Sequence, residues 1–68
     1  MTEIVLIRVT KVLELSEKAL LVKEFRNIKT PIPKSAYYGQ EGDDHWFAKW
    51  VVENNFKSDY TILKEKVV

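Results

Sequence analysis

The 68-residue chain has the composition of one small globular domain, with 46% hydrophobic and 31% charged residues. Eleven Lys and Arg against ten Asp and Glu give a formal charge of +1, which excludes a strongly basic nucleic-acid-binding arm and an acidic mimic of DNA. The absence of cysteine excludes a disulfide scaffold, a cysteine zinc site and a thiol nucleophile. We expect a single domain over residues 1–68 without a deep enclosed active site, because so short a chain needs nearly all its large apolar side chains for the core.

The apolar runs of the chain are short. The longest, Ile4 to Ile7 and Ala19 to Val22, have four residues each, far fewer than a membrane span requires. The start Met1-Thr2-Glu3 lacks the basic residues of a secretion signal. We therefore expect a cytoplasmic protein, located in the host cytoplasm if the chain is viral, with no membrane contact.

Alternation predicts a strand over residues 1–15 with one solvated face. Ile4, Leu6 and Val12 interrupt the alternation, as expected of a strand that is covered on both sides or bent around a small barrel. The apolar residues at odd-numbered positions are Val5, Ile7, Val9 and Leu13, and the polar residues at even-numbered positions are Arg8, Thr10 and Glu14.

Residues 19–26 predict a second strand that pairs with the first after the polar break at Ser16-Glu17-Lys18. The same region also fits a helix, because Val12, Leu15, Ala19 and Val22 recur at helical spacing among good helix formers. Periodicity alone leaves both interpretations open.

Two prolines define the middle of the chain. Residues 27–33 should form a turn followed by extended chain, because Pro31 and Pro33 fix φ and remove two backbone donors. Residues 31–38 are then an edge strand or an extended segment. The sequence from Gly39 to Gly42 predicts a loop.

The pattern predicts a helix from about Asp44 to Asn54, because Trp46, Phe47, Trp50 and Val51 recur at the i, i+3, i+4 spacing of a helix. Acidic side chains before this run suit the cap and the helix dipole. Asn55 is the expected left-handed stop residue. Weak alternation from residue 58 to residue 68 predicts a final strand.

Three segments occur in an order that resembles a loose set of short phage and prophage proteins. The family has the patterns E-K-A-x-L-V, W-x-P-K-S-Q and W-L-A-E-K-x-G-L, and the likeness covers about two thirds of the chain. Pro31 stands where the family has Trp, and Asn55 where it has Gly. The resemblance implies a small β-rich domain with one helix and no agreed biochemical activity, and it favours strands for residues 12–26. The matching segments are Leu15-Ser16-Glu17-Lys18-Ala19-Leu20-Leu21-Val22, Pro31-Ile32-Pro33-Lys34-Ser35 and Trp50-Val51-Val52-Glu53-Asn54-Asn55-Phe56.

Glu41, Asp43, Asp44 and His45 are side chains of the kinds that divalent metals accept. Their spacing matches no calcium or zinc motif, and capping and the helix dipole explain acidic residues before a helix equally well. We therefore predict no metal site.

Ser35, His45 and either Asp44 or Asp59 are the residue types of a hydrolytic triad. No nucleophile elbow surrounds Ser35, and the two glycines do not form a phosphate-binding loop. We expect no enzyme, no cofactor and no small-molecule substrate.

The basic residues are unevenly distributed. Residues 1–34 carry seven Lys and Arg against four acids, a charge of +3, whereas residues 35–68 carry four against six, a charge of −2. Basic side chains beside tyrosines along one edge of a small barrel would supply the phosphate contacts and stacking surfaces of a single-strand nucleic-acid binder. An ordinary solvated face with tyrosines in the core is the alternative. The candidate residues are Lys23, Arg26, Lys29, Lys34, Tyr37 and Tyr38.

Trp46, Phe47 and Trp50 lie within five positions of the expected helix and cover a wider arc than one core stripe needs. Trp is enriched in interface hot spots, and self-association would enlarge a small core. Our leading hypothesis is a non-enzymatic binding module of phage type that acts by protein contact at these residues, as a homo-oligomer or as a modulator of a partner protein. Single-stranded nucleic-acid binding is the alternative. The expected fold is α+β, a curved antiparallel sheet of three to four strands with one α-helix packed on it.

Overall fold

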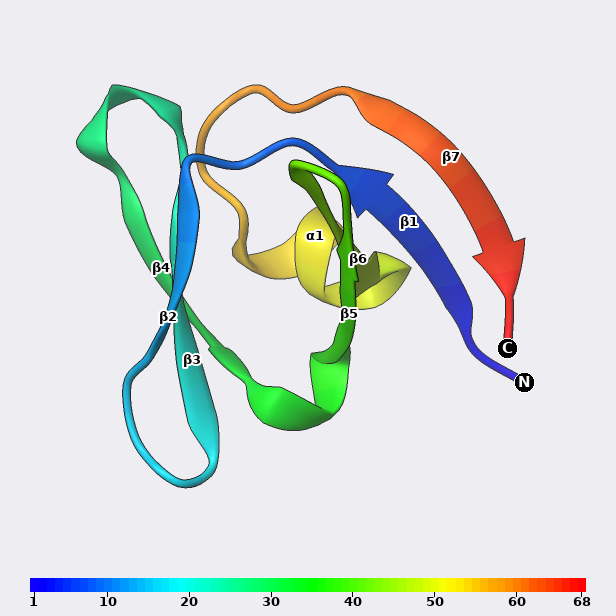
Figure 1. The fold of residues 1–68 in the computed structure, drawn as a ribbon, viewed down its shortest axis with the longest axis horizontal. Coiled ribbons are helices and arrows are strands. Elements are labelled where there is room, and N and C mark those ends of the chain that lie inside the picture. The colour runs from blue at the N-terminus through cyan, green and yellow to red at the C-terminus, as the bar shows by residue number, and fades with distance from the viewer.

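The computed structural model describes residues 1–68 as two antiparallel sheets and one α-helix (Figure 1). The α+β class with antiparallel strands and one α-helix is confirmed. The prediction of a single sheet is wrong, because the strands divide between a four-stranded sheet, β5-β6-β1-β7, and a three-stranded sheet, β2-β3-β4. The elements are β1 (Glu3–Ile7), β2 (Lys11–Glu14), β3 (Ala19–Lys23), the 3₁₀ turn η1 (Phe25–Asn27), β4 (Lys29–Pro33), the 3₁₀ turn η2 (Lys34–Ala36), β5 (Tyr37–Glu41), β6 (Asp44–Ala48), α1 (Lys49–Asn55) and β7 (Ile62–Val67).

The first predicted strand is divided between the two sheets. β1 pairs with β6 and β7, whereas β2 pairs with β3, and residues 8–10 carry the chain across. Because the chain changes sheets, the core-facing positions change from odd-numbered to even-numbered residues. Val5 and Ile7 are core residues of β1, but Val12 is the core-facing residue of β2. The extra apolar residues of β1, Ile4 and Leu6, lie on its other face. The irregular alternation of residues 1–15 therefore reflects a strand that bends between sheets.

Strands β2, β3 and β4 form a meander, so the strand interpretation of this region is confirmed and the helical one is wrong. The second predicted strand, residues 19–26, is too long, because β3 ends at Lys23 and the turn η1 begins at Phe25. The chain turns between β3 and β4 through Arg26 and Asn27, which have φ values of 66° and 60°. Pro31 and Pro33 lie in β4, at the edge of the sheet, as the missing backbone donors of proline require.

The helix predicted from Asp44 is wrong in its first half. Residues 44–48 form β6, which is paired on one side with β5 and on the other with β1, and α1 begins only at Lys49. Successive residues of a strand point to opposite faces, so Trp46 joins the cluster of Ile4 and Leu6 while Phe47 enters the main core. The apparent helical spacing arises because a strand with two aromatic residues runs directly into a short helix.

Two local predictions next to this region also change. β5 extends to Glu41, so the predicted loop from Gly39 to Gly42 is reduced to a tight turn at Gly42 and Asp43, with Gly42 at a φ of 62°. Asn55 does not have a positive φ and is the last helical residue, after which the chain leaves in an extended conformation.

One core joins both sheets and the helix. Its ten buried residues come from β1, β3, β4, β6, α1 and the connecting segments, and α1 lies against β1, β6 and β4. The predicted final strand is confirmed as β7, which pairs with β1 at the edge of the four-stranded sheet. None of the helices has the length and apolar composition needed to span a bilayer.

Candidate functional site

Three lysines lie side by side across the three-stranded sheet. Lys11 of β2 is the register partner of Lys23 of β3, and Lys23 is in turn the partner of Lys29 of β4. Partners in antiparallel strands share one face and have Cβ atoms about 5 Å apart. In each strand the residue next to the lysine faces the core, as Val22 does beside Lys23. Successive residues of a strand point to opposite faces, so these lysines lie on the outer face of the sheet. We call Lys11, Lys23 and Lys29 the lysine row.

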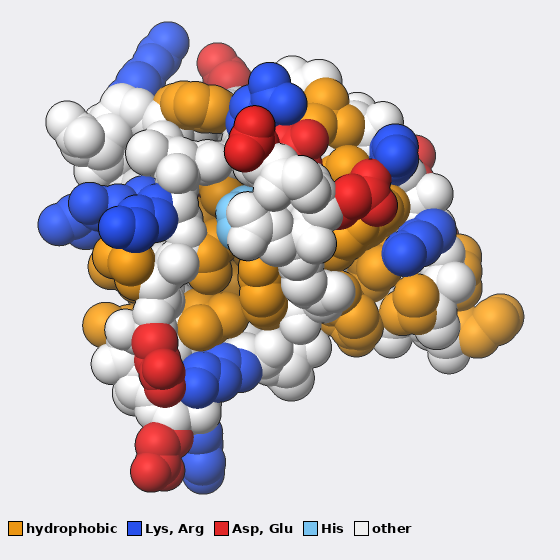
Figure 2. All heavy atoms as spheres, in the orientation of Figure 1, with side chains coloured by type: hydrophobic (Ala, Val, Ile, Leu, Met, Phe, Trp, Pro, Cys, Tyr) orange, Lys and Arg blue, Asp and Glu red, His pale blue; other side chains and the backbone are white.

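The lysine row has no acidic partner. Four other cationic side chains have a carboxylate oxygen within 3.8 Å, namely Arg8, Lys34, Lys49 and Lys64. No member of the row forms such a pair. The three lysines therefore repel one another without a neutralising carboxylate, and like charges directly opposite one another disfavour strand pairing. Figure 2 shows blue Lys and Arg side chains gathered over the three-stranded sheet. The lysine row is thus a set of three adjacent cations without a carboxylate partner on one face of this sheet.

The turn after β3 adds a cation and an aromatic ring. Arg26 is exposed in η1, next to the end of the sheet at which Lys23 and Lys29 are paired. Phe25 of the same turn is 48% exposed. An exposed ring beside uncompensated cations is the combination that single-strand nucleic-acid binders use, stacking for bases and charge for phosphates.

The predicted nucleic-acid residues are only partly brought together. Lys23, Arg26 and Lys29 lie together, but Lys34 is at the other end of β4, where its Nζ is 3.0 Å from a carboxylate oxygen of Glu14. Tyr38 is exposed on β5 of the other sheet. Tyr37 packs in the interior, with its ring centroid 5.7 Å from that of Phe47. The two tyrosines are therefore not stacking platforms beside the lysine row.

Sequence reasoning missed Lys11 and Phe25. A signal for Lys11 was present, because a hairpin centred on Glu17, in the polar break, pairs residue 11 with residue 23. A turn centred on Arg26 likewise pairs residue 23 with residue 29. The exposure of Phe25 had no such signal, since it depends on which way the turn faces.

A groove of about 530 Å³ opens where the chain passes between the sheets. Its walls are residues 8–12, Phe25 and three residues of the β5–β6 hairpin, Gln40, Asp43 and His45. The Oη of Tyr37 lies 2.8 Å from Nδ1 of His45. Burial lowers the pKa of His45 and outweighs the opposing effect of Asp44, so the imidazole is neutral at pH 7.

The acidic residues near His45 do not assemble into a metal site. Asp44 accepts a hydrogen bond from Nε of Arg8 at 2.8 Å, and Glu41 accepts one from Nζ of Lys64 at 2.9 Å. No group of three or more His, Asp or Glu side chains is placed to hold a metal ion.

The residue types of the hydrolytic triad do not come together either. The side-chain hydrogen bond of His45 is made with Tyr37, and neither Ser35 nor Asp59 hydrogen-bonds to the imidazole. Asp44 is engaged by Arg8. The geometry therefore offers no assembled nucleophile and base at these positions.

The predicted protein-contact residues are separated by the strand. Phe47 is fully buried, and Trp46 is 6% exposed beneath Lys66, whose Nζ lies 4.5 Å from the ring centroid. Trp50, on α1, is 49% exposed. The three side chains therefore do not form one helix face, and only Trp50 is presented to solvent.

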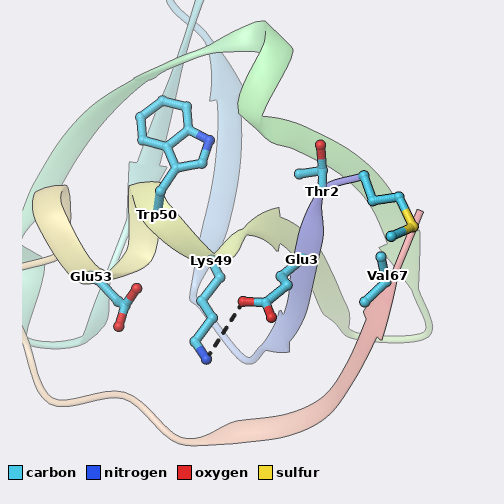
Figure 3. A pocket seen from close by; sticks show the side chains of 7 residues that line it. Thr2, Glu3, Lys49, Trp50, Glu53 and Val67 are labelled. Atoms are coloured by element: carbon cyan, nitrogen blue, oxygen red, sulfur yellow. Dashed lines mark ion pairs between the residues drawn. The ribbon is translucent and has the colours of Figure 1, made fainter.

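Trp50 lines a second hollow of about 540 Å³, at the start of α1. Figure 3 shows Glu3 and Lys49 pointing toward one another beside Trp50, with Val67 of β7 at the far side. Nζ of Lys49 is 3.8 Å from a carboxylate oxygen of Glu3. The hollow thus combines an exposed indole with charges of both signs.

Glu24, which sequence reasoning did not single out, is a buried carboxylate behind the turn that carries Phe25 and Arg26. It accepts hydrogen bonds from the hydroxyl of Thr30, the backbone N–H groups of Lys57 and Ser58, and the hydroxyl of Ser58. Burial alone would raise the pKa of Glu24, but these hydrogen bonds outweigh it, so its pKa lies below the ordinary value. This carboxylate fastens the segment after α1 to the end of β3.

Comparison of the chain with protein-family models, curated proteins and solved structures finds no match. The resemblance to short phage and prophage proteins therefore stays a prediction.

Proposed function

We propose that this protein is a non-enzymatic module that binds single-stranded nucleic acid through the lysine row, with Arg26 and Phe25 at the adjacent turn. The observation that carries the proposal is the pairing of three lysines in register without a carboxylate partner. Such an arrangement costs stability, and a bound polyanion would remove that cost.

The geometry favours a single strand over a duplex. Neighbouring strands of a sheet lie about 4.8 Å apart, so the lysine row forms a line of three ammonium groups across one small face. Phe25 beside that line is accessible to the face of a base only when the base is unstacked from its neighbours. The lysine row supplies +3 of a net charge of +1, so the rest of the molecule is net −2 and adds no attraction. Binding should therefore come from the phosphate contacts of the row and weaken as salt is added.

Fluorescence anisotropy of a labelled single-stranded oligonucleotide at several salt concentrations tests the proposal. We expect log K to fall linearly with log salt, and the double variant Lys23→Gln, Lys29→Gln to bind more weakly with a slope smaller by about 1.4, roughly 0.7 for each phosphate that the variant no longer neutralises. The matched control is Lys34→Gln, which removes a cation of η2, directly after β4, that is already paired with Glu14.

The control variant should keep the affinity and the salt slope of the original protein. Absence of binding at low salt, or an equal loss in the control and the double variant, would contradict the proposal. Circular dichroism of each variant establishes that it is folded.

A second candidate function, protein contact, is favoured by the exposure of Trp50 beside Glu3 and Lys49. A patch that carries both charge signs around an indole can face a second copy of itself across a two-fold axis. Light scattering should then give twice the monomer mass of 8.0 kDa, and Trp50→Ala should restore the monomer. A monomer at all concentrations, or a dimer that Trp50→Ala leaves intact, counts against this candidate.

A further inference from the structure

The groove between the sheets contains hydrogen-bonding and aromatic side chains that phosphate binding by the lysine row does not require. It is built from three separate parts of the chain: residues 8–12, which include the crossing segment and the start of β2, the turn that carries Phe25, and the β5–β6 hairpin. Figure 2 shows the pale-blue side chain of the one histidine in a hollow beside the blue cluster over the three-stranded sheet. Lys11 belongs both to the wall of this groove and to the lysine row.

His45 lines this groove, and only one of its two ring nitrogens forms a side-chain hydrogen bond. The side chain is largely buried, with 8% of the residue exposed, and its Nδ1 is occupied by the hydroxyl of Tyr37. No buried side-chain nitrogen or oxygen lacks a hydrogen-bond partner, so the unpaired Nε2 is not sealed in the core. His45 lines the groove, so Nε2 is the ring nitrogen available to a ligand bound there.

The other walls supply what a flat heterocycle requires. The amide nitrogen of Gln40 donates to the carbonyl of Gly42 at 2.8 Å, which holds the side chain in place and leaves its amide oxygen free to accept. Asp43, at the tip of the hairpin, forms no ion pair and is a second acceptor. The half-exposed ring of Phe25 forms an apolar wall. Hydrogen-bonding groups opposite an aromatic ring are the means by which proteins hold an unstacked base.

We propose that this groove binds one nucleobase of the single strand, with the base against Phe25 and its polar edge toward His45 and Gln40, while the lysine row holds the adjoining phosphates. This inference rests on the proposed function. It adds that the protein distinguishes a strand with bases from a bare polyanion, and that the base is held between the sheets rather than at the tyrosines.

Two labelled oligonucleotides of equal length and charge test the groove, one with bases and one whose sugars are all abasic. We expect the original protein to bind the base-bearing strand about tenfold more tightly, as stacking of one base predicts. Phe25→Ala should reduce this preference to about unity without changing affinity for the abasic strand. Tyr38→Ala is the matched control, because Tyr38 is similarly exposed but does not line the groove.

The outcomes separate the groove from the lysine row. Equal affinity for the two strands would overturn the base site and leave phosphate binding by the lysine row intact. A preference that survives Phe25→Ala, or is lost in Tyr38→Ala, would also overturn it. Binding of neither strand would overturn the proposed function and this inference together.

A second readout does not depend on the lysine row. The imidazole resonances of His45 should shift when a nucleoside monophosphate is added and should stay in place when inorganic phosphate is added at the same concentration. Equal shifts with both additives, or no shift with either, would contradict a base-binding groove even if the oligonucleotides bind.

Discussion

At the scale of single residues, Glu24 shows how a charged side chain can hold a loop in place. Its carboxylate is buried and receives hydrogen bonds from Thr30, Lys57 and Ser58. Hydrogen bonds to a charged group are stronger than neutral ones, and a buried carboxylate without them would be costly. Glu24 therefore joins two segments far apart in the sequence and, with them, positions the turn that presents Phe25 and Arg26.

We predict that Glu24→Gln lowers the free energy of unfolding by about 1–2 kcal/mol at pH 7, because the hydrogen bonds lose their charged acceptor. The native pKa of Glu24 lies below its ordinary value of 4.5, so the folded chain binds fewer protons than the unfolded chain in this range. The stabilisation is therefore complete above the ordinary pKa and is lost as the pH falls through the lower native pKa.

Urea unfolding at pH 7 and at about pH 3 measures this dependence. The difference between the original protein and Glu24→Gln should shrink on acidification. Glu17→Gln is the control, because Glu17 is exposed and forms no ion pair or side-chain hydrogen bond. A difference that is the same at both pH values would show that Glu24 does not contribute through its charge.

At the scale of elements, β6 and α1 form one continuous segment in two conformations. β6 is enclosed between β5 and β1, where its backbone groups are paired on both sides, whereas α1 lies on the core with only part of its surface covered. Phe47 is consequently a core residue and Trp50 a surface residue, although both fit the same helical spacing in the sequence.

We predict unequal effects of truncating these two aromatics. Phe47→Ala should lower the free energy of unfolding by about 3–5 kcal/mol, enough to unfold much of so small a domain, because it leaves a cavity in the core. Trp50→Ala should cost less than about 1 kcal/mol, as substitutions of exposed side chains usually do. Urea unfolding followed by far-ultraviolet circular dichroism distinguishes the two, and similar losses would restore the helix-face interpretation.

At the scale of the whole molecule, the two sheets depend on one shared core. Val22 and Ile32 of the three-stranded sheet are in the same cluster as Val5 and Phe47 of the four-stranded sheet. Neither sheet has a separate core of comparable size, since the second cluster contains only Ile4, Leu6 and Trp46. The groove at their junction is therefore held open by the same packing that stabilises the fold.

We predict that Ile32→Val, a change in the three-stranded sheet, destabilises the four-stranded sheet by the same amount. The expected loss is about 1 kcal/mol, the cost of one buried methylene group. Hydrogen exchange of backbone amides in β3 and in β6 should show equal decreases in protection when both exchange by global unfolding. A decrease confined to β3 would indicate that the sheets unfold separately.

Much of the candidate site could be predicted from the sequence, and the part that could not depends on register. Lys23, Arg26 and Lys29 are recognisable as neighbours because they flank one turn. Lys34 is close to them in the sequence, but β4 carries it to the opposite end of the sheet, next to Glu14. The burial of the two tyrosines could not be predicted. They are consecutive residues of one strand, so one faces the interior and the other faces solvent, and nothing in the sequence indicates which is which.

The sequence by itself determined the residue types and some of the local strands, but not β6, where its spacing predicts a helix. Alternation, two prolines, the helical spacing after residue 44 and the absence of cysteine, together with the resemblance that favours strands for residues 12–26, predicted a small antiparallel α+β domain without disulfides. These features follow from interactions between neighbours along the chain.

The tertiary structure alone decided which strands share a sheet, where β6 ends and α1 begins, and which lysines stand side by side. These properties arise from hydrogen bonds and packing between segments far apart in the sequence, such as β1 with β6 and β7. The spacing of residues along the chain does not indicate such pairings, because the same apolar pattern fits both a helix and a strand. Contact with a partner segment decides between the two.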